Sequence, residues 1–367
     1  MDVDRISKEI PKLRKKSQKR FVENVLILFS QLSSSVCLRG PYRLIVDSNI
    51  IMRLESYRNG NITEGVLSVF LFFDFLKRSN FRADLVIRPS VFYEFVHQKQ
   101  FRSVRQHWDE FKKLRDTIGE ELSITPFFDG IETFHNAEYY LKQIEHDVAL
   151  ISKELNSYKT RDWKFDFVRP HGGFDGALIN EHLIEVPPFF AAQGLYKELG
   201  LTYFDETQAS RFLIEHICKN LSECRKNDQR VIDKYNSDKE FLLTKVLKLT
   251  AKGNLTGIAD VDILTLCNVQ TQFSRQAHGR YYPASIGLSM DTNLSNALSF
   301  FSGIHLNSGD MFGGVDNQED NSAKLEAWSH DQARLHEGDD RTRDILRQQQ
   351  EFFQEVSPVL FNDIENA

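Results

Sequence analysis

The chain has 367 residues, enough for about two to three domains and for a core that needs no metal or disulfide to hold it. Hydrophobic residues make up 41% and charged residues 27% of the sequence, a balance typical of globular proteins in water. The net charge of −6 is unevenly distributed, because residues 307–367 hold 14 acidic and 5 basic residues and residues 1–306 carry +3. The four cysteines form no C-x-x-C pair, which excludes a zinc ribbon and a thioredoxin-type redox site.

No segment of the sequence is suited to a membrane or to secretion. The strongest apolar run, residues 65–75, is short and contains Asp74, whereas a transmembrane helix needs about 20 apolar residues. The first residues are charged and are followed by no apolar region of the kind found in secretory signals. We therefore expect no membrane association and a cytoplasmic protein, in agreement with its few cysteines.

Residues 1–40 are predicted to form a basic N-terminal helix. Phe21, Val25 and Phe29 lie at helical spacing within residues 4–32. Residues 5–20 contain eight Lys or Arg and one Glu. Such a stretch suits contact with phosphate groups, although a solvent-exposed helix face could have the same composition. The residues expected to contact nucleic acid are Lys12, Arg14, Lys15, Lys16, Lys19 and Arg20.

Three short, mostly apolar runs predict strands, at residues 44–46, 85–87 and 286–290. Polar residues do not alternate along them, as expected for strands of a parallel sheet that are buried on both faces. Apolar stretches with helical spacing lie between the strands, one of them opened by Pro89. Residues 41–97 and 238–306 together therefore predict one α/β domain in two parts.

The remaining segments interrupt or extend this domain. Residues 98–237 are predicted to be a mainly helical insertion, with helices near 104–122 and 137–158 and another near 207–220. Residues 307–367 are predicted to be an acidic C-terminal tail with one amphipathic helix over 340–355. Because that helix has a narrow apolar face, we expect the tail to be dispensable for the core fold. The insertion or the tail could bind a protein partner or mediate self-association.

Three acidic residues follow the predicted strands. Asp47 and Asp291 end two of them, and ligands of open parallel sheets bind at the carboxyl ends of the strands. Each could instead cap the helix that follows, since Asp is a preferred N-cap residue. Glu94 lies beside the apolar stripe of the helix after the second strand, where the simpler alternative is a carboxylate at the edge of the helix in solvent.

Two more acids, Asp260 and Asp262, lie in the first turn of a predicted helix over 259–267. Helical spacing places Asp260 with Ile263, Leu264 and Cys267, so we expect Asp260 to face the interior, where a charge needs a partner. The same spacing turns Asp262 away from Asp260. The alternative is that both acids favour the positive N-terminus of the helix.

Acids that gather at one edge of a sheet require a cation, because like charges repel and raise the pKa of each carboxyl group. Oxygen ligands without histidine or thiolate favour Mg²⁺ or Mn²⁺. Such ions activate water and stabilise the charge that develops on a phosphate group. The expected metal ligands are Asp47, Glu94, Asp260, Asp262 and Asp291.

These acids lie in four short motifs, at residues 44–49, 89–94, 257–264 and 288–291. In their order the motifs resemble those of the PIN-domain nucleases. The resemblance implies a three-layer α/β/α domain with a central parallel sheet, and metal-dependent hydrolysis of phosphodiester bonds, usually in RNA. By the same resemblance the catalytic acids are Asp47, Glu94, Asp260 and Asp291, and the supporting residues are Ser48, Asn49 and Ser289.

The resemblance covers about half of the chain, and residues 98–237 depart from the spacing of minimal members of the family. Either Asp260 or Asp262 can be aligned with the third acid, and the helical spacing favours Asp260, with Asp262 as an auxiliary. RNA is the expected substrate. The alternatives are a structure-selective DNA nuclease with the same site, and an inactive nucleic-acid-binding or scaffold protein with a PIN-like core.

Overall fold

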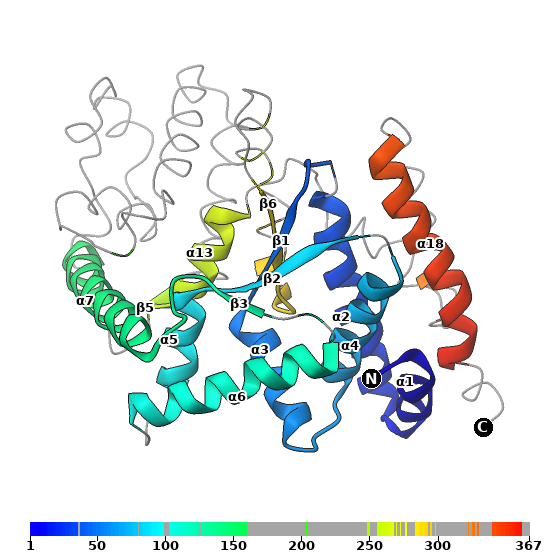
Figure 1. Ribbon diagram of the computed structural model, residues 1–367, viewed down its shortest axis with the longest axis horizontal. Helices are drawn as coiled ribbons and strands as arrows, with labels where there is room; N and C mark the ends of the chain where they lie inside the picture. The colour runs from blue at the N-terminus through cyan, green and yellow to red at the C-terminus, as the bar shows by residue number, and fades with distance from the viewer. Residues whose placement is uncertain are drawn as a thin grey trace. The chain divides into compact units, whose positions relative to one another are not determined.

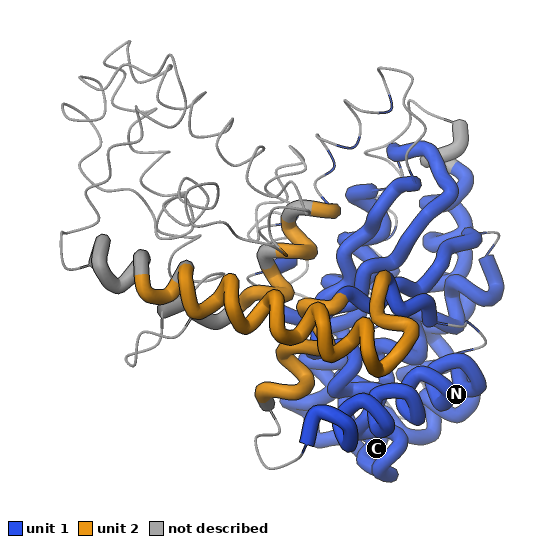
Figure 2. Tube along the Cα trace, turned by 60° about the vertical axis from the view of Figure 1, so that its left-hand side comes forward, with its two compact units in different colours: residues 1–88, 101–129, 267–367 blue, residues 89–100, 130–266 orange. Residues whose placement is uncertain are grey.

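Two compact units make up the computed structural model of the chain (Figure 2). Unit 1 comprises residues 1–88, 101–129 and 267–367, and unit 2 comprises residues 89–100 and 130–266. The structure describes residues 1–159 (except 36, 80, 99–102, 123 and 125), 203, 248–249, 255–267, 283–292 and 340–361, together with residues 269, 272, 276, 294, 295, 298, 322, 325, 326 and 329. Most of the predicted insertion, including the helix expected near 207–220, lies outside the described residues.

Unit 1 is built on a parallel sheet (Figure 1). Its strands are β1 (Tyr42–Val46), β2 (Ala83–Ile87), β3 (Pro126–Phe128) and β6 (Ala284–Leu288). They lie in the order β3-β2-β1-β6, and Leu44 of β1 stands opposite Leu85 on one side and Ile286 on the other. The three predicted strands and their parallel arrangement are confirmed, so the chain is an α/β protein.

Strand β3 lies within the segment that the sequence assigns to an insertion, yet it belongs to the sheet of unit 1. It has only three residues and begins with Pro126, and proline is tolerated at the first residue of an edge strand. The helix before it, α6 (Val104–Leu122), packs against it. Phe111 of α6 stacks on Phe128 with ring centroids 5.2 Å apart.

Four further helices of unit 1 are α1 (Val3–Glu9), α2 (Lys15–Ser35), α3 (Ser48–Arg58) and α4 (Glu64–Arg78). Helix α2 packs against both α4 and β6, and the Ser68 hydroxyl of α4 donates to the Phe21 carbonyl of α2 at 3.2 Å. The single helix predicted over residues 4–32 is divided, because Pro11 lies in a short 3₁₀ turn, η1 (Ile10–Lys12), between α1 and α2. Proline has no N–H to continue a helix.

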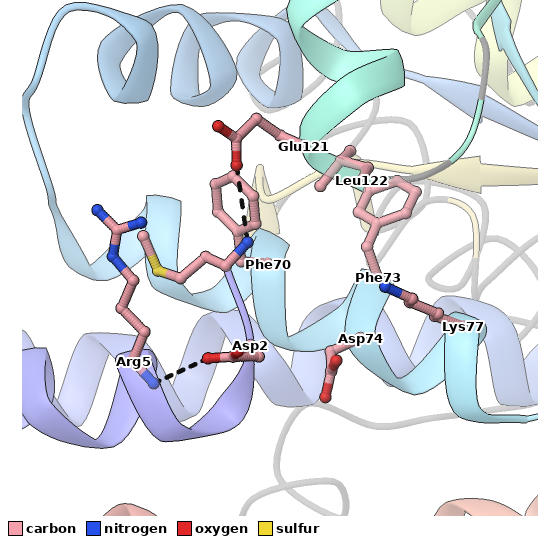
Figure 3. A pocket seen from close by; sticks show the side chains of 9 residues that line it. Asp2, Arg5, Phe70, Phe73, Asp74, Lys77, Glu121 and Leu122 are labelled. Carbon is pink, nitrogen blue, oxygen red and sulfur yellow. Dashed lines mark hydrogen bonds and ion pairs between the residues drawn. The ribbon is translucent and has the colours of Figure 1, made fainter.

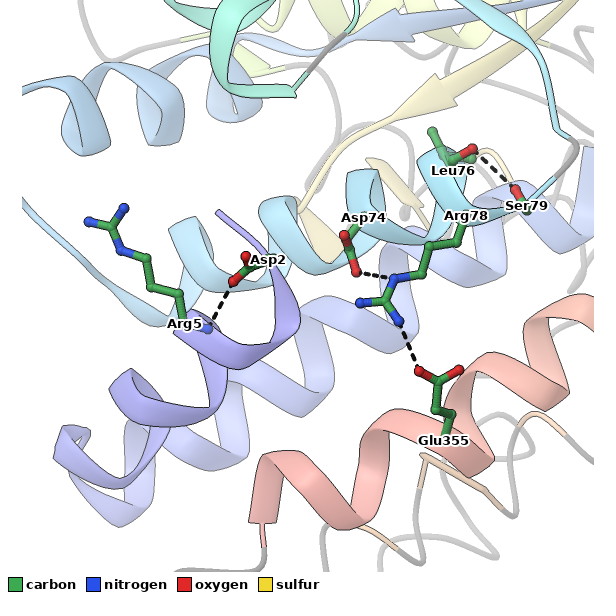
Figure 4. A network of polar contacts seen from close by, with 7 residues as sticks. All are labelled: Asp2, Arg5, Asp74, Leu76, Arg78, Ser79 and Glu355. Carbon is green, nitrogen blue, oxygen red and sulfur yellow. Dashed lines mark hydrogen bonds and ion pairs between the residues drawn. The ribbon is translucent and has the colours of Figure 1, made fainter.

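The C-terminal helix α18 (Asp340–Phe361) also belongs to unit 1. Phe353 is fully buried, and its ring lies 4.7 Å from that of Phe29 in α2. Glu355 forms an ion pair with Arg78 of α4 at 2.9 Å (Figure 4). This packing argues against the expectation that residues 307–367 are dispensable for the core fold. The predicted helix ended at Glu355, and the added turn, with Pro358 inside it, buries Val356, Leu360 and Phe361.

Unit 2 contains three described helices and a short antiparallel ribbon. The helices are α5 (Pro89–Gln98), α7 (Phe134–Lys159) and α13 (Ile258–Leu266), and the ribbon pairs β4 (Lys248–Leu249) with β5 (Leu255–Thr256). Helix α5 packs against α7 and against α13. Across the described parts of both units, no helix combines the length and the apolar character that crossing a membrane requires.

Candidate functional site

Asp47 lies directly after β1 and directly before α3. Its side chain makes no capping hydrogen bond to α3, although it occupies the N-cap position. The carboxylate is 2% exposed and accepts hydrogen bonds from the Ser48 hydroxyl at 3.2 Å, from the Ser289 hydroxyl at 2.7 Å and from the Asn49 amide. The Asp47 side chain therefore does not act as a helix cap.

Ser289 meets Asp47 because β1 and β6 pair in parallel with Val46 opposite Leu288. Each residue is the first beyond its strand, and the Asp47 N–H continues the ladder by donating to the Leu288 carbonyl at 2.9 Å. The Ser289 hydroxyl also accepts from the Asn49 amide at 2.9 Å and from the Asp291 N–H at 3.0 Å. Its one donor and two acceptor positions are thus all used. We call Asp47, Asn49 and Ser289 the Asp47 cluster.

Asp291 differs from Asp47 in position and in bonding. The predicted strand ended at Met290, whereas β6 ends at Leu288 and the Met290 N–H donates to the Asn49 side chain at 3.1 Å. Asp291 is exposed, and its carboxylate accepts from the Leu294 N–H at 3.1 Å. That bond, three residues ahead, is the bond of an N-cap, so Asp291 caps the residues that follow it through one of its two carboxylate oxygens.

Glu94 of unit 2 is half-buried, and its carboxylate accepts a hydrogen bond from the Ala259 N–H at 3.1 Å. Ala259 lies in the first turn of α13, whose free N–H groups favour a negative charge. Glu94 is therefore bonded to the start of α13 and is not the solvent-exposed edge residue that the simpler alternative describes.

The helical-spacing argument for Asp260 is wrong. Asp262 is fully buried, and Asp260 is only half-buried. The buried residues of α13 include Ile258, Ala259, Asp262, Ile263 and Leu264. They lie on most sides of the helix, so the apolar neighbours of position 260 do not show that Asp260 is the buried acid.

The Asp262 carboxylate is bonded by two hydroxyl groups that the sequence did not single out. Ser90 of α5 donates to it at 2.7 Å, and the hydroxyl of Tyr203 donates to the same oxygen. The backbone N–H of Tyr203 donates to a second fully buried carboxylate, that of Asp147 in α7, at 2.7 Å. Tyr203 thus joins two buried acids of unit 2, and no motif in the sequence marks it for this role.

A tyrosine beside Glu94 in α5 is held neutral by its surroundings. Burial raises the pKa of the Tyr93 phenol to about 12, and the nearby Glu145 and Glu94 add to the shift. The Tyr93 ring stacks on that of His97, with centroids 4.0 Å apart. His97 in turn lies 3.8 Å from the carboxylate of Glu145.

The predicted acids thus form two groups, Asp47 and Asp291 in unit 1, and Glu94, Asp260 and Asp262 in unit 2. Within the described ranges, no three His, Cys, Asp or Glu side chains gather closely enough to hold a metal ion. The donor atoms of the Asp47 cluster are all carboxylate, amide and hydroxyl groups, the hard donors that suit Mg²⁺ or Mn²⁺ rather than softer metals.

The six basic residues predicted to contact nucleic acid are all exposed. Only weak ion pairs involve them among the described residues, Lys12 with Glu9 at 2.8 Å and Arg20 with Glu64 at 3.9 Å. Exposed pairs of this kind contribute little, so the positive charge stays available to a ligand. We call Lys12, Arg14, Lys15, Lys16, Lys19 and Arg20 the basic stripe.

A cavity of about 260 Å³ lies in unit 1 among α1, α4 and α6 (Figure 3). Phe70, Phe73, Asp74 and Glu121 are among the residues that line it. Burial raises the pKa of Asp74, and the ion pair with Arg78 at 2.8 Å only partly opposes that shift. The side chains around this cavity carry both signs of charge and select no single class of ligand.

No protein-family model, curated protein or solved structure matches this chain.

Proposed function

We propose that this chain is a metal-dependent nuclease that hydrolyses phosphodiester bonds, with RNA as its expected substrate and a three-layer PIN-like fold. One observation supports this proposal above the others. Asp47 is a buried carboxylate at the carboxyl end of a parallel strand, and its side chain is oriented by Asn49 and Ser289 instead of capping α3. That edge of a parallel sheet is where such folds bind ligands.

By the resemblance of the sequence motifs, the residues proposed to hold Mg²⁺ or Mn²⁺ are Asp47, Glu94, Asp260 and Asp291. Their donors are carboxylate oxygens, which fit either ion. When bound, a divalent ion lowers the pKa of a bound water and neutralises charge on a phosphate group. We place Asp260 before Asp262 in this set, because the Asp262 carboxylate is fully buried and one of its oxygens accepts from both Ser90 and Tyr203.

Neighbouring side chains fix the orientation of the Asp47 carboxylate. Asn49 bonds to the Asp47 carboxylate and to Ser289 through its amide nitrogen, and to the Met290 N–H through its oxygen. Asp47 is therefore held in one position before any ligand binds, which reduces the cost of ordering a site. The exposed basic stripe would attract the phosphate backbone of a nucleic acid.

A second candidate function is nucleic-acid binding without cleavage. It is favoured by the hydrogen bonds of Asp47, because hydroxyl and amide donors already satisfy both of its carboxylate oxygens. A carboxylate with this bonding can have a purely structural role. Cleavage of a nucleic acid by the purified wild-type protein separates the two candidates.

Labelled RNA and DNA panels, incubated with Mn²⁺, Mg²⁺ or EDTA, test the proposal. Cleavage with either ion and none with EDTA supports a nuclease, and the substrate that is cut distinguishes RNA from DNA. Binding without cleavage under every condition would support the second candidate.

Asp47→Asn keeps the size of the side chain and removes its charge, so it should abolish cleavage and reduce the rise in melting temperature that Mn²⁺ causes. Asp129→Asn is the matched control. Asp129 also follows a strand of the same sheet, β3, and its N–H continues the ladder to Ile87 at 3.1 Å, but its carboxylate pairs with Arg88. Full activity of Asp47→Asn would exclude the proposed site.

A further inference from the structure

Two glutamine side chains lie along the free edge of β6. Among the described strands, β6 is at the edge of the sheet and pairs with β1. The amide of Gln272 donates to the Ser285 carbonyl at 2.9 Å and accepts from the Ser285 N–H. The amide of Gln31 donates to the Ser289 carbonyl at 2.9 Å and accepts from the Ser289 N–H at 3.0 Å. Each side chain makes the pair of bonds that a neighbouring strand would make.

Gln31 lies in α2, where it is 3% exposed. A buried amide in such a position is costly unless its donors and acceptor are bonded. All are bonded here, because the second donor of the Gln31 amide is directed at the Ser295 hydroxyl. The orientation of the amide is also fixed, since exchanging its oxygen and nitrogen would set acceptor against acceptor and donor against donor at Ser289.

We propose that Gln31 is a positioning residue for the Asp47 cluster. It bonds the backbone N–H and C=O of Ser289, and the Ser289 hydroxyl donates to Asp47 at 2.7 Å. Gln31 touches neither Asp47 nor a ligand of the proposed metal, and acts through Ser289. This inference rests on the proposed function, because it assigns Gln31 a role in orienting a metal-binding carboxylate.

Gln272 provides a matched control on the same strand. Gln31→Met and Gln272→Met each remove a buried amide that bonds the N–H and the C=O of one residue, Ser289 directly after β6 and Ser285 within it. Ser285 and Ser289 are four residues apart, which is roughly 13 Å along a strand. Both variants should lose thermal stability, but only Gln31→Met should alter the response to metal.

The first measurement is a Mn²⁺ titration followed by melting temperature, with cleavage as the second readout. For Gln31→Met we expect a rise of ~10–100-fold in the Mn²⁺ concentration that gives half of the full increase in melting temperature. Such a rise is the usual result of removing a residue that orients a metal ligand. For Gln272→Met we expect it to stay within about twofold of wild type, as expected for a residue remote from the ligands. Equal shifts in the two variants would overturn the inference.

A double-mutant cycle shows whether Gln31 acts through Ser289. Ser289→Ala removes the hydroxyl, and if Gln31 works only by holding that hydroxyl, then Gln31→Met in the Ser289→Ala background should change the metal response no further. Independent, additive shifts would overturn the inference. Should Gln31→Met not fold, Gln31→Glu has the same length and still accepts from the Ser289 N–H, and it enters the same cycle with the same criterion.

Measurements on the wild-type protein distinguish a failure of the proposed function from a failure of the role proposed for Gln31. If it shows neither cleavage nor a metal-induced rise in melting temperature, the proposed function fails and the role of Gln31 fails with it. If the wild type responds to metal and Gln31→Met responds identically, only the role of Gln31 is wrong.

Discussion

Replacing Phe353 by alanine tests whether the C-terminal helix is part of the core of unit 1. Phe353 is fully buried, and its ring lies against those of Phe29 and Phe352 at 4.7 and 5.7 Å. Removing a buried phenylalanine side chain costs about 3–5 kcal/mol through lost transfer free energy and the cavity that remains. For a domain of this size that corresponds to a fall in melting temperature of roughly 6–20 °C.

The matched control is Val359→Ala on the same helix. Val359 is 44% exposed, so its replacement should change the free energy of unfolding by no more than about 0.5 kcal/mol. Urea unfolding followed by circular dichroism measures both variants, and an unchanged m-value would indicate that the same surface unfolds. Equal stability of Phe353→Ala and Val359→Ala would refute the assignment of α18 to the core. Ending the chain at residue 339 removes the whole helix and should destabilise unit 1 more than Phe353→Ala does.

Three further results are expected. Changing the four lysines of the basic stripe to glutamate should weaken nucleic-acid binding. The slope of the logarithm of the binding constant against the logarithm of salt concentration should fall by about one unit for each phosphate group that is no longer bound. An unchanged slope would mean that the stripe is only a solvent-exposed face. Ser90→Ala and Tyr203→Phe should each lower the free energy of unfolding by about 1.5–3 kcal/mol in urea titrations, since each removes a hydrogen bond to buried Asp262. Because burial raises the pKa of Asp74, the native state binds that proton more tightly than the unfolded state, and stability should fall as pH rises through the raised pKa. Asp74→Asn stays neutral and should remove that fall in melts between pH 4 and pH 8.

The strands of the sheet could be predicted where the sequence marks burial on both faces. Residues 44–46 and 85–87 are continuous apolar runs, and both belong to parallel strands. Strand β3 could not be predicted in this way, because Phe127 is 49% exposed and the strand has only three residues. Its place in the sheet depends on pairing with β2, a contact between distant segments that local composition does not specify.

The helices show a different limit. The helical spacing of α13 favoured Asp260 as the buried acid, whereas Asp262 is the fully buried one. Apolar residues surround both positions, and no polar face indicates the exposed side. The predicted end of the last helix at Glu355 was too early for a related reason. A proline usually ends a helix, but Pro358 lies inside α18, and the residues after it are buried. Packing against the core outweighs the local preference in both helices.

The bonding of Asp47 depends on a register that the sequence alone could not supply. The carboxyl ends of two strands could be predicted to carry Asp47 and a serine, but these residues are 242 positions apart. They meet because Val46 stands opposite Leu288. A shift of one residue would turn Ser289 to the other face of the sheet, and Asp47 would lose the hydroxyl that replaces the capping bond to α3. The choice between a helix cap and an oriented carboxylate is therefore made by the pairing of β1 with β6, and the interpretation of Asp47 as a site residue depends on that pairing.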